Sequence, residues 1–195
     1  MAHHGPPDIT SKRWMLALVI TSVIIFLSFL FNTQRDAVFG ILNYGIGEKS
    51  QVPIGPYYKV IRVVDGDTIV VNINGVDEKV RLIGMNTPET VDPRKTVECF
   101  GKEASARMEQ LADGKNVRLE ADSTQSTRDI YGRLLDYVYL EDGQMLNRKM
   151  IAEGYAYEYT YMTPYKYQKE FRDVQTLARV STRGLWSAET CNGKK

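Results

Sequence analysis

The chain has 195 residues, of which 43% are hydrophobic and 25% charged, and its formal net charge is +1. This composition is that of an ordinary globular protein and excludes a disordered or fibrous one, while the length fits one domain with an appendage. Because the charges nearly cancel, a nucleic-acid partner would have to be attracted by a local basic patch or by a bound cation.

The histidine and cysteine content excludes several kinds of site. The only histidines, His3 and His4, lie at the N-terminus. The rest of the chain therefore cannot form a Ser-His-Asp triad, use a histidine base or hold a histidine-ligated zinc ion. The two cysteines, Cys99 and Cys191, are too far apart in the sequence for a zinc ribbon or a CxxC redox pair.

The N-terminal region predicts a membrane anchor. A polar stretch, residues 1–13, ends in two basic residues and precedes residues 14–31, an apolar run without a charge. This run is near the lower length limit for a membrane-spanning helix. A cleaved signal peptide begins in the same way, but its apolar region usually has only about 7–15 residues. We expect 14–31 to be an uncleaved single transmembrane helix with 1–13 as a cytoplasmic tail, since basic flanks stay inside. The domain then lies outside the cytoplasm, or is secreted if the segment is cleaved.

The remaining chain predicts an α+β domain. Residues 32–56 are expected to be a linker, 57–190 the globular domain and 191–195 a C-terminal tail. Five segments are predicted as strands, and the first two of them are rich in Val and Ile: 57–64, 68–73, 79–83, 116–121 and 134–140. Three segments are predicted as helices: 101–111 and 166–178, which each have an apolar face, and 145–153, which Gly154 would end. The order of these elements predicts a five-stranded Greek-key barrel, the OB-fold, with three helices, preceded by the transmembrane helix.

Three short segments carry candidate chemistry: Asp65-Gly66-Asp67-Thr68, the stretch from Arg81 to Glu89, and Asp129-Ile130-Tyr131-Gly132-Arg133. Each segment alone is most simply a turn or the start of a strand. Together they supply carboxylate and carbonyl oxygens for a hard divalent cation, a second carboxylate as a base, and two arginines that can clamp a phosphate. This is the set of groups that phosphodiester cleavage requires.

The spacing of these residues resembles the staphylococcal nuclease (thermonuclease) family over residues 57–186. Asp67, Arg81, Glu89 and Arg133 stand at the separations found in that family. The resemblance implies a calcium-dependent endonuclease that hydrolyses DNA and RNA, preferably single-stranded, with little sequence preference. Its products would carry 5′-hydroxyl and 3′-phosphate ends. No protein partner is evident from the sequence.

The resemblance also implies a role for each site residue. Asp67 would be the metal carboxylate, and Thr87 would offer its backbone carbonyl to the metal, with Asp65 behind them. Asn86 stands where the family's best-known member has a second metal-binding aspartate, so it would bring an oxygen ligand without a charge. Calcium suits such an oxygen-only set.

The catalytic residues implied are Glu89, Arg81 and Arg133. Glu89 would be the general base, and the two arginines would bind the phosphate and stabilise the charge that develops on it. The alternative is a non-catalytic OB-fold module that binds nucleic acid from the membrane. A decayed domain would be expected to have lost Glu89 or one arginine, yet all three are present.

Two further predictions concern tyrosines and cysteines. Tyrosines alternate over residues 155–161, which indicates either an aromatic face packed on the core or a platform for stacking bases, with Tyr159 and Tyr161 as candidates. Tyr131, beside Arg133, is an equally plausible base contact. If the domain lies in an oxidising space, we expect a disulfide between Cys99 and Cys191, with two unpaired thiols as the alternative.

Overall fold

The computed structural model describes residues 22–24, 26–28, 54–90 and 97–194, and the chain divides into two units, residues 1–48 and 49–195. In the first unit, 22–24 and 26–28 are helical with exposed side chains, and the Ser28 hydroxyl donates a hydrogen bond to the Ile24 carbonyl at 2.8 Å. Among the described residues, no helix has the length and apolar character needed to cross a bilayer. Most of the predicted anchor, 14–31, the tail 1–13 and the linker up to residue 53 lie outside the described residues.

A closed five-stranded barrel forms the centre of the second unit, which confirms the predicted barrel. Its strands follow the order β1-β2-β3-β6-β5 around the barrel, and they are β1 (Tyr58–Asp65), β2 (Thr68–Ile73), β3 (Val76–Leu82), β5 (Asn116–Ala121) and β6 (Leu134–Leu140). Neighbouring strands are antiparallel except β3 and β6, which run parallel. The connection from β3 to β6 contains helix α2 (Gly101–Ala112) and strand β5.

The hairpin between β2 and β3 turns at Asn74 and Gly75, as the Asn-Gly pair predicts. Both residues have positive φ, 54° and 90°, which is the requirement of a type I′ turn. The side chain of Asn72 accepts a hydrogen bond from the Gly75 amide at 3.0 Å. This short turn fixes the register of the hairpin, so that Thr68 lies opposite Arg81.

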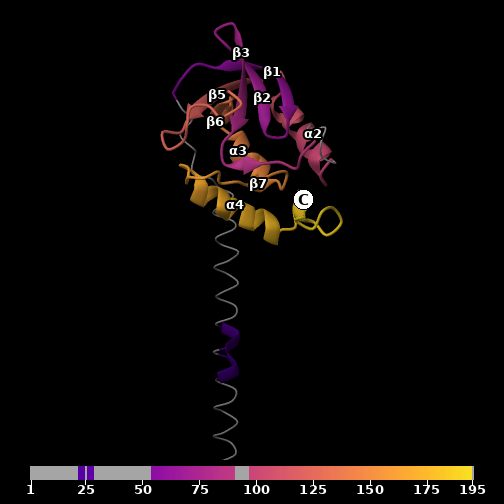
Figure 1. Ribbon diagram of the computed structural model, residues 1–195. Helices are drawn as coiled ribbons and strands as arrows, with labels where there is room; N and C mark the ends of the chain where they lie inside the picture. Colours follow the sequence, from indigo (N-terminus) through magenta and orange to yellow (C-terminus); the bar gives the residue numbers. More distant parts are fainter. Residues whose placement is uncertain (1–21, 25, 29–53, 91–96, 195) are drawn as a thin grey trace, which may run out of the picture. The chain divides into compact units, whose positions relative to one another are not determined.

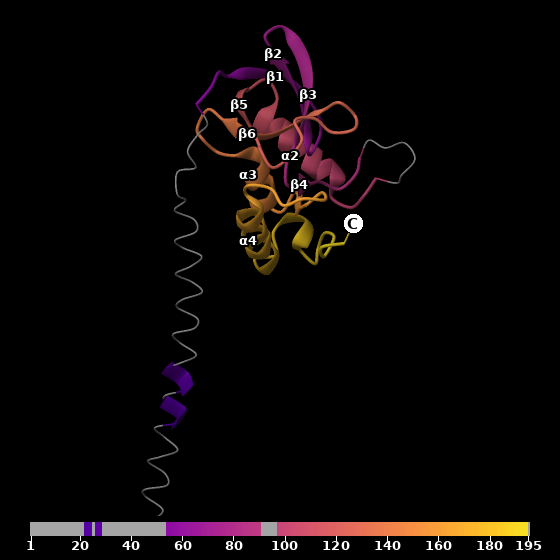
Figure 2. The ribbon, with the colours of Figure 1, turned by 60° about the vertical axis from the view of Figure 1, so that its left-hand side comes forward.

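Apolar residues of the barrel and of helices α3 (Leu146–Ala152) and α4 (Gln168–Val180) make up the core. Ile69, Val80 and Val138 are fully buried in the barrel strands, and Phe171 of α4 is fully buried as well. Its ring packs edge-on against Tyr137 of β6, with 6.2 Å between the ring centroids. Figures 1 and 2 show α3 between the barrel and α4, and α3 contacts both β6 and α4.

A second, two-stranded sheet joins the segment after β3 to the segment after α3. It pairs β4 (Met85–Asn86) with β7 (Tyr157–Glu158) and places Asn86 opposite Tyr157. The chain enters β4 through Gly84, where φ is 76° and an added Cβ would lie 2.5 Å from the ring of Tyr165. Only glycine fits this close approach. The sequence patterns predicted neither strand, because each has only two residues.

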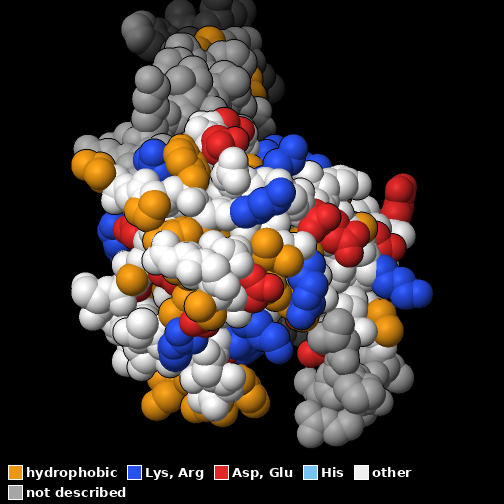
Figure 3. Space-filling model, turned by 90° about the horizontal axis from the view of Figure 1, so that it is seen from above, with side chains coloured by type: hydrophobic (Ala, Val, Ile, Leu, Met, Phe, Trp, Pro, Cys, Tyr) orange, Lys and Arg blue, Asp and Glu red, His pale blue; other side chains and the backbone are white. Residues whose placement is uncertain are grey.

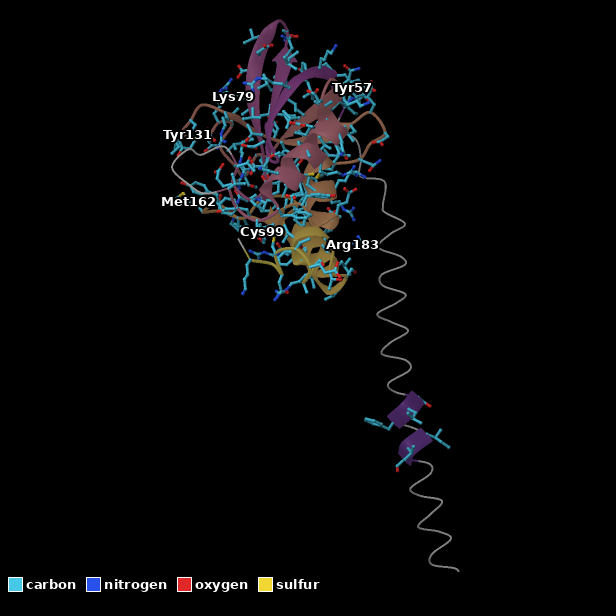
Figure 4. The ribbon with its side chains drawn as sticks, turned by 90° about the vertical axis from the view of Figure 1, so that its right-hand side faces the viewer. Tyr57, Lys79, Cys99, Tyr131, Met162 and Arg183 are labelled. Carbon is cyan, nitrogen blue, oxygen red and sulfur yellow. A yellow bond between two sulfur atoms is a disulfide. The ribbon has the colours of Figure 1, made fainter. Side chains whose placement is uncertain are left out.

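The C-terminal segment packs on the domain after the short 3-10 helix η1 (Gly184–Trp186). Cys99 and Cys191 form a disulfide, and Figure 4 places Cys99 beside this segment. The Gly193 amide donates to the Leu185 carbonyl at 2.8 Å, and the Tyr157 hydroxyl donates to the Lys194 carbonyl at 3.3 Å. Residues 191–194, expected to be a tail, therefore belong to the folded body.

Candidate active site

The turn between β1 and β2 places Asp67 at the centre of the site. Asp67 is 7% exposed, and its amide donates to the Asp65 carboxylate at 2.9 Å. Its Oδ2 accepts hydrogen bonds from the amide of Thr87 at 3.1 Å and from the hydroxyl of Thr87 at 3.3 Å. A Cβ on Gly66 would lie 2.7 Å from the Thr87 side chain, so glycine is needed for this contact. The Asp-Gly-Asp turn is thus joined directly to the segment after β4.

Arg81 lies near the end of β3, and its guanidinium contacts four acceptor atoms. Its Nη2 lies 3.0 Å from Asp67 Oδ2, and its Nη1 donates to the carbonyls of Leu82 and Met85 at 2.7 and 2.9 Å. Nη2 also donates to Asn86 Oδ1 at 3.0 Å. A guanidinium fixed by four acceptors keeps one orientation, which suits a group that must bind a phosphate in one place.

Arg133, at the start of β6, approaches the same turn from another element. Its Nε and amide donate to the Asp129 carboxylate at 2.6 and 3.0 Å, and its Nη1 lies 3.5 Å from the hydroxyl of Thr68. That hydroxyl donates to Asp67 Oδ1 at 3.0 Å. Burial opposes ionisation of Asp129, but the hydrogen bonds from Arg133 outweigh it and lower the pKa of Asp129. Asp129 therefore stays ionised and orients Arg133 toward Asp67.

Glu89 follows two residues after Thr87 and is half-buried. Its amide donates to Glu98 Oε2 at 3.0 Å, and its carbonyl accepts the Glu98 amide at 2.9 Å. Its own carboxylate accepts the Thr90 amide at 2.9 Å. The backbone amide and the backbone carbonyl of Glu89, the predicted base, are thus both hydrogen-bonded.

Comparison with known proteins places this site in a family. The family model described as staphylococcal nuclease homologue matches residues 79–188, more than half of the chain. The thermonuclease of Staphylococcus hyicus is 37% identical over 170 residues, covering 87% of this chain and 95% of the relative. The chain belongs to the staphylococcal nuclease family.

Two other relatives match over shorter stretches. The thermonuclease of Staphylococcus intermedius is 42% identical over 132 residues, which are 68% of this chain and 77% of that protein. Endonuclease YncB of Bacillus subtilis is 39% identical over 127 residues, which are 65% of this chain and 59% of that protein.

In this member of the staphylococcal nuclease family, the oxygens expected to bind a metal lie close together. Asp67 and Asn86 both contact Arg81, and the Asn86 amide Nδ2 donates to the Thr87 carbonyl at 3.2 Å. A buried carboxylate, an amide oxygen and a backbone carbonyl are the ligand types that suit calcium. The donor set therefore fits the ion. To bind calcium through both Asn86 Oδ1 and the Thr87 carbonyl, the Asn86 side chain must give up its hydrogen bonds with Arg81 and with the Thr87 carbonyl.

Asp65 lies directly behind this group. Burial, with the adjacent charge of Asp67 as the second cause, raises the pKa of Asp65 to about 7. Its Oδ1 holds the Asp67 amide. Among the described residues, no group of three or more His, Cys, Asp or Glu side chains is arranged to hold a metal ion.

The tyrosines divide into packed and exposed ones. Tyr155 stacks on Phe100 at 5.4 Å between ring centroids, and Tyr157 meets Trp186 edge-on at 5.3 Å. Tyr159 and Tyr161, in the loop after β7, are instead 42% and 61% exposed. The alternation over residues 155–161 thus ends in two rings that are open to solvent.

Tyr131 is the most exposed of the predicted base contacts, at 77%. The guanidinium carbon of Arg133 lies 5.4 Å from its ring centroid. Its loop is connected to the loop after β7, because the Gln125 side chain donates to Thr163 Oγ1 and to the Pro164 carbonyl at 3.2 and 3.1 Å. Figure 4 shows Tyr131 and Met162, from these two loops, along the same side of the domain.

On the face seen in Figure 3, the described Lys and Arg side chains are interspersed with Asp and Glu. This agrees with the net charge of +1.

Sequence reasoning did not identify Thr68, Asp129 and Glu98 as supports of the site. The first two stand inside the quoted segments, and the spacing of Asp129 and Arg133 was a usable signal for an ion pair. Glu98 gave no such signal, since it meets Glu89 only through the fold.

Proposed function

We propose that this chain is a calcium-dependent endonuclease that hydrolyses phosphodiester bonds in DNA and RNA with little sequence preference, leaving 5′-hydroxyl and 3′-phosphate ends. The observation that carries the proposal is the convergence of Arg81 and Thr87 on Asp67, which lies in another segment of the chain, at hydrogen-bonding distance. Relatives named thermonuclease and endonuclease support the nuclease activity.

The chemistry assigned to the chain's own residues is a hydrolytic displacement at phosphorus. Glu89 orients a water molecule and accepts its proton as the water oxygen attacks. Arg81 and Arg133 donate hydrogen bonds to the phosphate oxygens, where negative charge increases in the transition state. The P–O5′ bond breaks, and the leaving oxygen takes up a proton to become the 5′-hydroxyl.

Asp67, Asn86 and the Thr87 carbonyl are the proposed calcium ligands. When bound, calcium supplies positive charge next to the scissile phosphate. Asp67 and Thr87 are already held together by two hydrogen bonds, so these two ligands are preorganised.

The exposed tyrosines favour single-stranded or frayed substrate. Tyr131, Tyr159 and Tyr161 are exposed, and exposed aromatic rings can stack on unpaired bases without reading their sequence. In a duplex the bases are already stacked on one another and are not available to these rings.

We also propose that residues 14–31 anchor the chain in a membrane, with the nuclease domain outside the cytoplasm. The uncharged apolar sequence of that run supports this, as do the exposed apolar side chains of Val23, Phe26 and Leu27. A disulfide is also the expected state of paired cysteines in an oxidising space.

The proposed function is tested with the full chain in detergent. A single-stranded oligonucleotide labelled at one end is incubated with calcium or with a chelator, and the ends of the products are identified by enzymatic end-labelling. We expect calcium-dependent products with 5′-hydroxyl ends. Binding of the oligonucleotide without cleavage would instead identify a non-catalytic binding module.

A further inference from the structure

A reciprocal pair of hydrogen bonds fixes the backbone of Glu89. The Glu89 amide donates to Glu98 Oε2 at 3.0 Å, and the Glu98 amide donates back to the Glu89 carbonyl at 2.9 Å. Both polar groups of the Glu89 backbone are thus held by one residue. An N–H donor to a carboxylate is among the stronger hydrogen bonds, so this pair resists displacement of Glu89.

The next residue after Glu98 is covalently attached to a distant part of the fold. Cys99 forms a disulfide with Cys191, 92 residues later in the chain. Cys191 is 7% exposed. The residues after it are bound to the domain by hydrogen bonds that include Gly193 to Leu185 and Tyr157 to Lys194. The disulfide therefore links Cys99, and with it the neighbouring Glu98, to a C-terminal segment that is hydrogen-bonded to the domain.

The turn between Glu98 and helix α2 also packs tightly on the segment of Glu89. A Cβ added to Gly101 would lie 3.1 Å from the carbonyl oxygens of both Pro88 and Glu89. Phe100, between Cys99 and Gly101, has a φ of 66°, a conformation that costs a non-glycine residue free energy. Such a conformation persists where the surrounding structure enforces it, and the disulfide is the covalent constraint nearest to it.

We propose that Glu98 is a positioning residue for Glu89 and that the Cys99–Cys191 disulfide holds Glu98 in place, so that the nuclease turns over fully only in its oxidised form. This inference rests on the proposed function, in which Glu89 is the base. Glu98 acts through Glu89 and not on the substrate.

The redox step is an exchange with a dithiol reductant. One thiolate of the dithiol attacks a sulfur of the Cys99–Cys191 bond, and its second thiolate then closes the reductant into its own disulfide. The protein gains two electrons and two protons and becomes two thiols. Cys99 is exposed, so a reductant in solution can reach the bond. Without the cross-link, the strained turn at Phe100 can relax and release the Glu89 backbone.

The first experiment compares the oxidised and the dithiol-reduced full chain at a temperature where circular dichroism shows both to be folded. We expect reduction to lower kcat on single-stranded DNA by about 10- to 100-fold, the usual effect of removing a supporting contact behind an active group, with KM nearly unchanged. The double variant Cys99→Ala/Cys191→Ala should start at the reduced value and not respond to the dithiol. Equal kcat values for the oxidised and reduced wild type would overturn the proposal.

The second experiment leaves the disulfide intact and changes Glu98. Glu98→Ala should lower kcat by a similar factor at nearly constant KM, whereas Glu98→Gln keeps an acceptor oxygen for the Glu89 amide and should retain most of the turnover. Glu109→Ala, an exposed change on α2, is the matched control and should be neutral. If Glu98→Ala turned over like wild type, Glu98 would have no positioning role.

A third measurement separates this proposal from the proposed function. Hydrogen exchange at the Glu89 amide, followed by NMR, reports the Glu98 contact without any substrate. We expect faster exchange after reduction and in Glu98→Ala, with protection restored in Glu98→Gln. An oxidised chain that shows this protection but cleaves nothing would contradict the nuclease function and leave the contact standing. Unchanged exchange after reduction would overturn the coupling itself.

Discussion

Arg81 forms an ion pair with Asp67, with 3.0 Å between Nη2 and Oδ2, and the two side chains are only 13% and 10% exposed. Arg81 is proposed to bind the phosphate, and Asp67 is proposed to bind calcium. In the folded protein each also neutralises the charge of its partner. Loss of either one therefore leaves an uncompensated charge in a mostly buried place, so stability and turnover must be measured together.

Two substitutions of Arg81 separate its contribution to stability from its proposed role in turnover. Arg81→Ala should lower the free energy of unfolding by about 3–5 kcal/mol, because Asp67 loses its partner. Arg81→Lys keeps the charge but cannot reach the carbonyls of Leu82 and Met85 with the same planar fork. We expect Arg81→Lys to remain more stable than Arg81→Ala and still to lose about 10²–10³-fold in kcat. Urea unfolding and steady-state cleavage measure both effects, with Arg148→Lys as the control at a half-buried ion pair of another part of the domain. Normal turnover by Arg81→Lys would remove Arg81 from the phosphate site.

Glu89→Gln tests the general base directly. The amide keeps the size of the side chain but cannot accept a proton, so kcat should fall by about 10²–10⁴-fold while KM changes little. Single-turnover cleavage of a short oligonucleotide gives the rate of the chemical step, and Glu109→Gln is the exposed control. A Gln variant with near-normal calcium-dependent turnover would show that another group is the base.

Tyr131 should act on binding more than on chemistry. Its ring is 77% exposed beside Arg133, and stacking of one base is typically worth about 1–3 kcal/mol. Tyr131→Ala should therefore raise KM for single-stranded DNA, whereas Tyr131→Phe, which keeps the ring, should resemble wild type. Steady-state kinetics on single-stranded and duplex substrates of one sequence would measure this. The same KM for all three proteins on the single strand would exclude Tyr131 as a base contact.

Asp136 gives the fold a pH dependence of its own. It lies on β6 opposite Leu82 and is 7% exposed, and this burial raises its pKa to about 6. The folded state then binds the proton more tightly than the unfolded state does. Its contribution is most favourable below the unfolded pKa near 4 and is lost as the pH rises through about 6, by on the order of 2–3 kcal/mol.

The variant Asp136→Asn should remove this dependence. Relative to wild type it should gain free energy of unfolding at pH 8 but not at pH 4, as measured by urea denaturation. Asp113→Asn, at an exposed position, is the matched control for the loss of one carboxylate. A constant difference between Asp136→Asn and wild type from pH 4 to 8 would mean that Asp136 ionises normally in the folded protein.

The barrel could be predicted from the sequence because its determinants are local. The apolar run in 68–73 and the Asn74-Gly75 turn define a hairpin within one short segment. The pairing of Asn86 with Tyr157 depends on residues 71 positions apart and on strands too short to have a period. The contact between Glu89 and Glu98 likewise follows from the packing of α2 on the loop before it, which no pattern of residues expresses.

Asn86 is the subject of the last prediction, because among the proposed calcium ligands its side chain brings an oxygen without a charge. Its Nδ2 donates to the Thr87 carbonyl at 3.2 Å, and its Oδ1 accepts from Arg81 at 3.0 Å. Calcium would compete with these N–H donors for the Thr87 carbonyl and for Asn86 Oδ1. Asp67 would be the one carboxylate among the proposed ligands. Calcium sites tune affinity through the number of charged ligands, so we expect weak binding by the free enzyme, with Kd about 10⁻⁴–10⁻³ M.

Asn86→Asp should strengthen calcium binding for two reasons. It removes the N–H group that faces Thr87 and adds a negative charge, so calcium should bind more tightly without substrate. In the wild type a substrate phosphate supplies that missing charge, and nucleotide and calcium should each tighten binding of the other by the same factor. This coupling should be smaller in Asn86→Asp. Titration calorimetry of both proteins with calcium, with and without a nucleoside 3′,5′-bisphosphate, measures all four affinities. Micromolar calcium binding by the wild type alone, or an unchanged affinity in Asn86→Asp, would mean that Asn86 does not contact the metal and that other oxygens around Asp67 form the site.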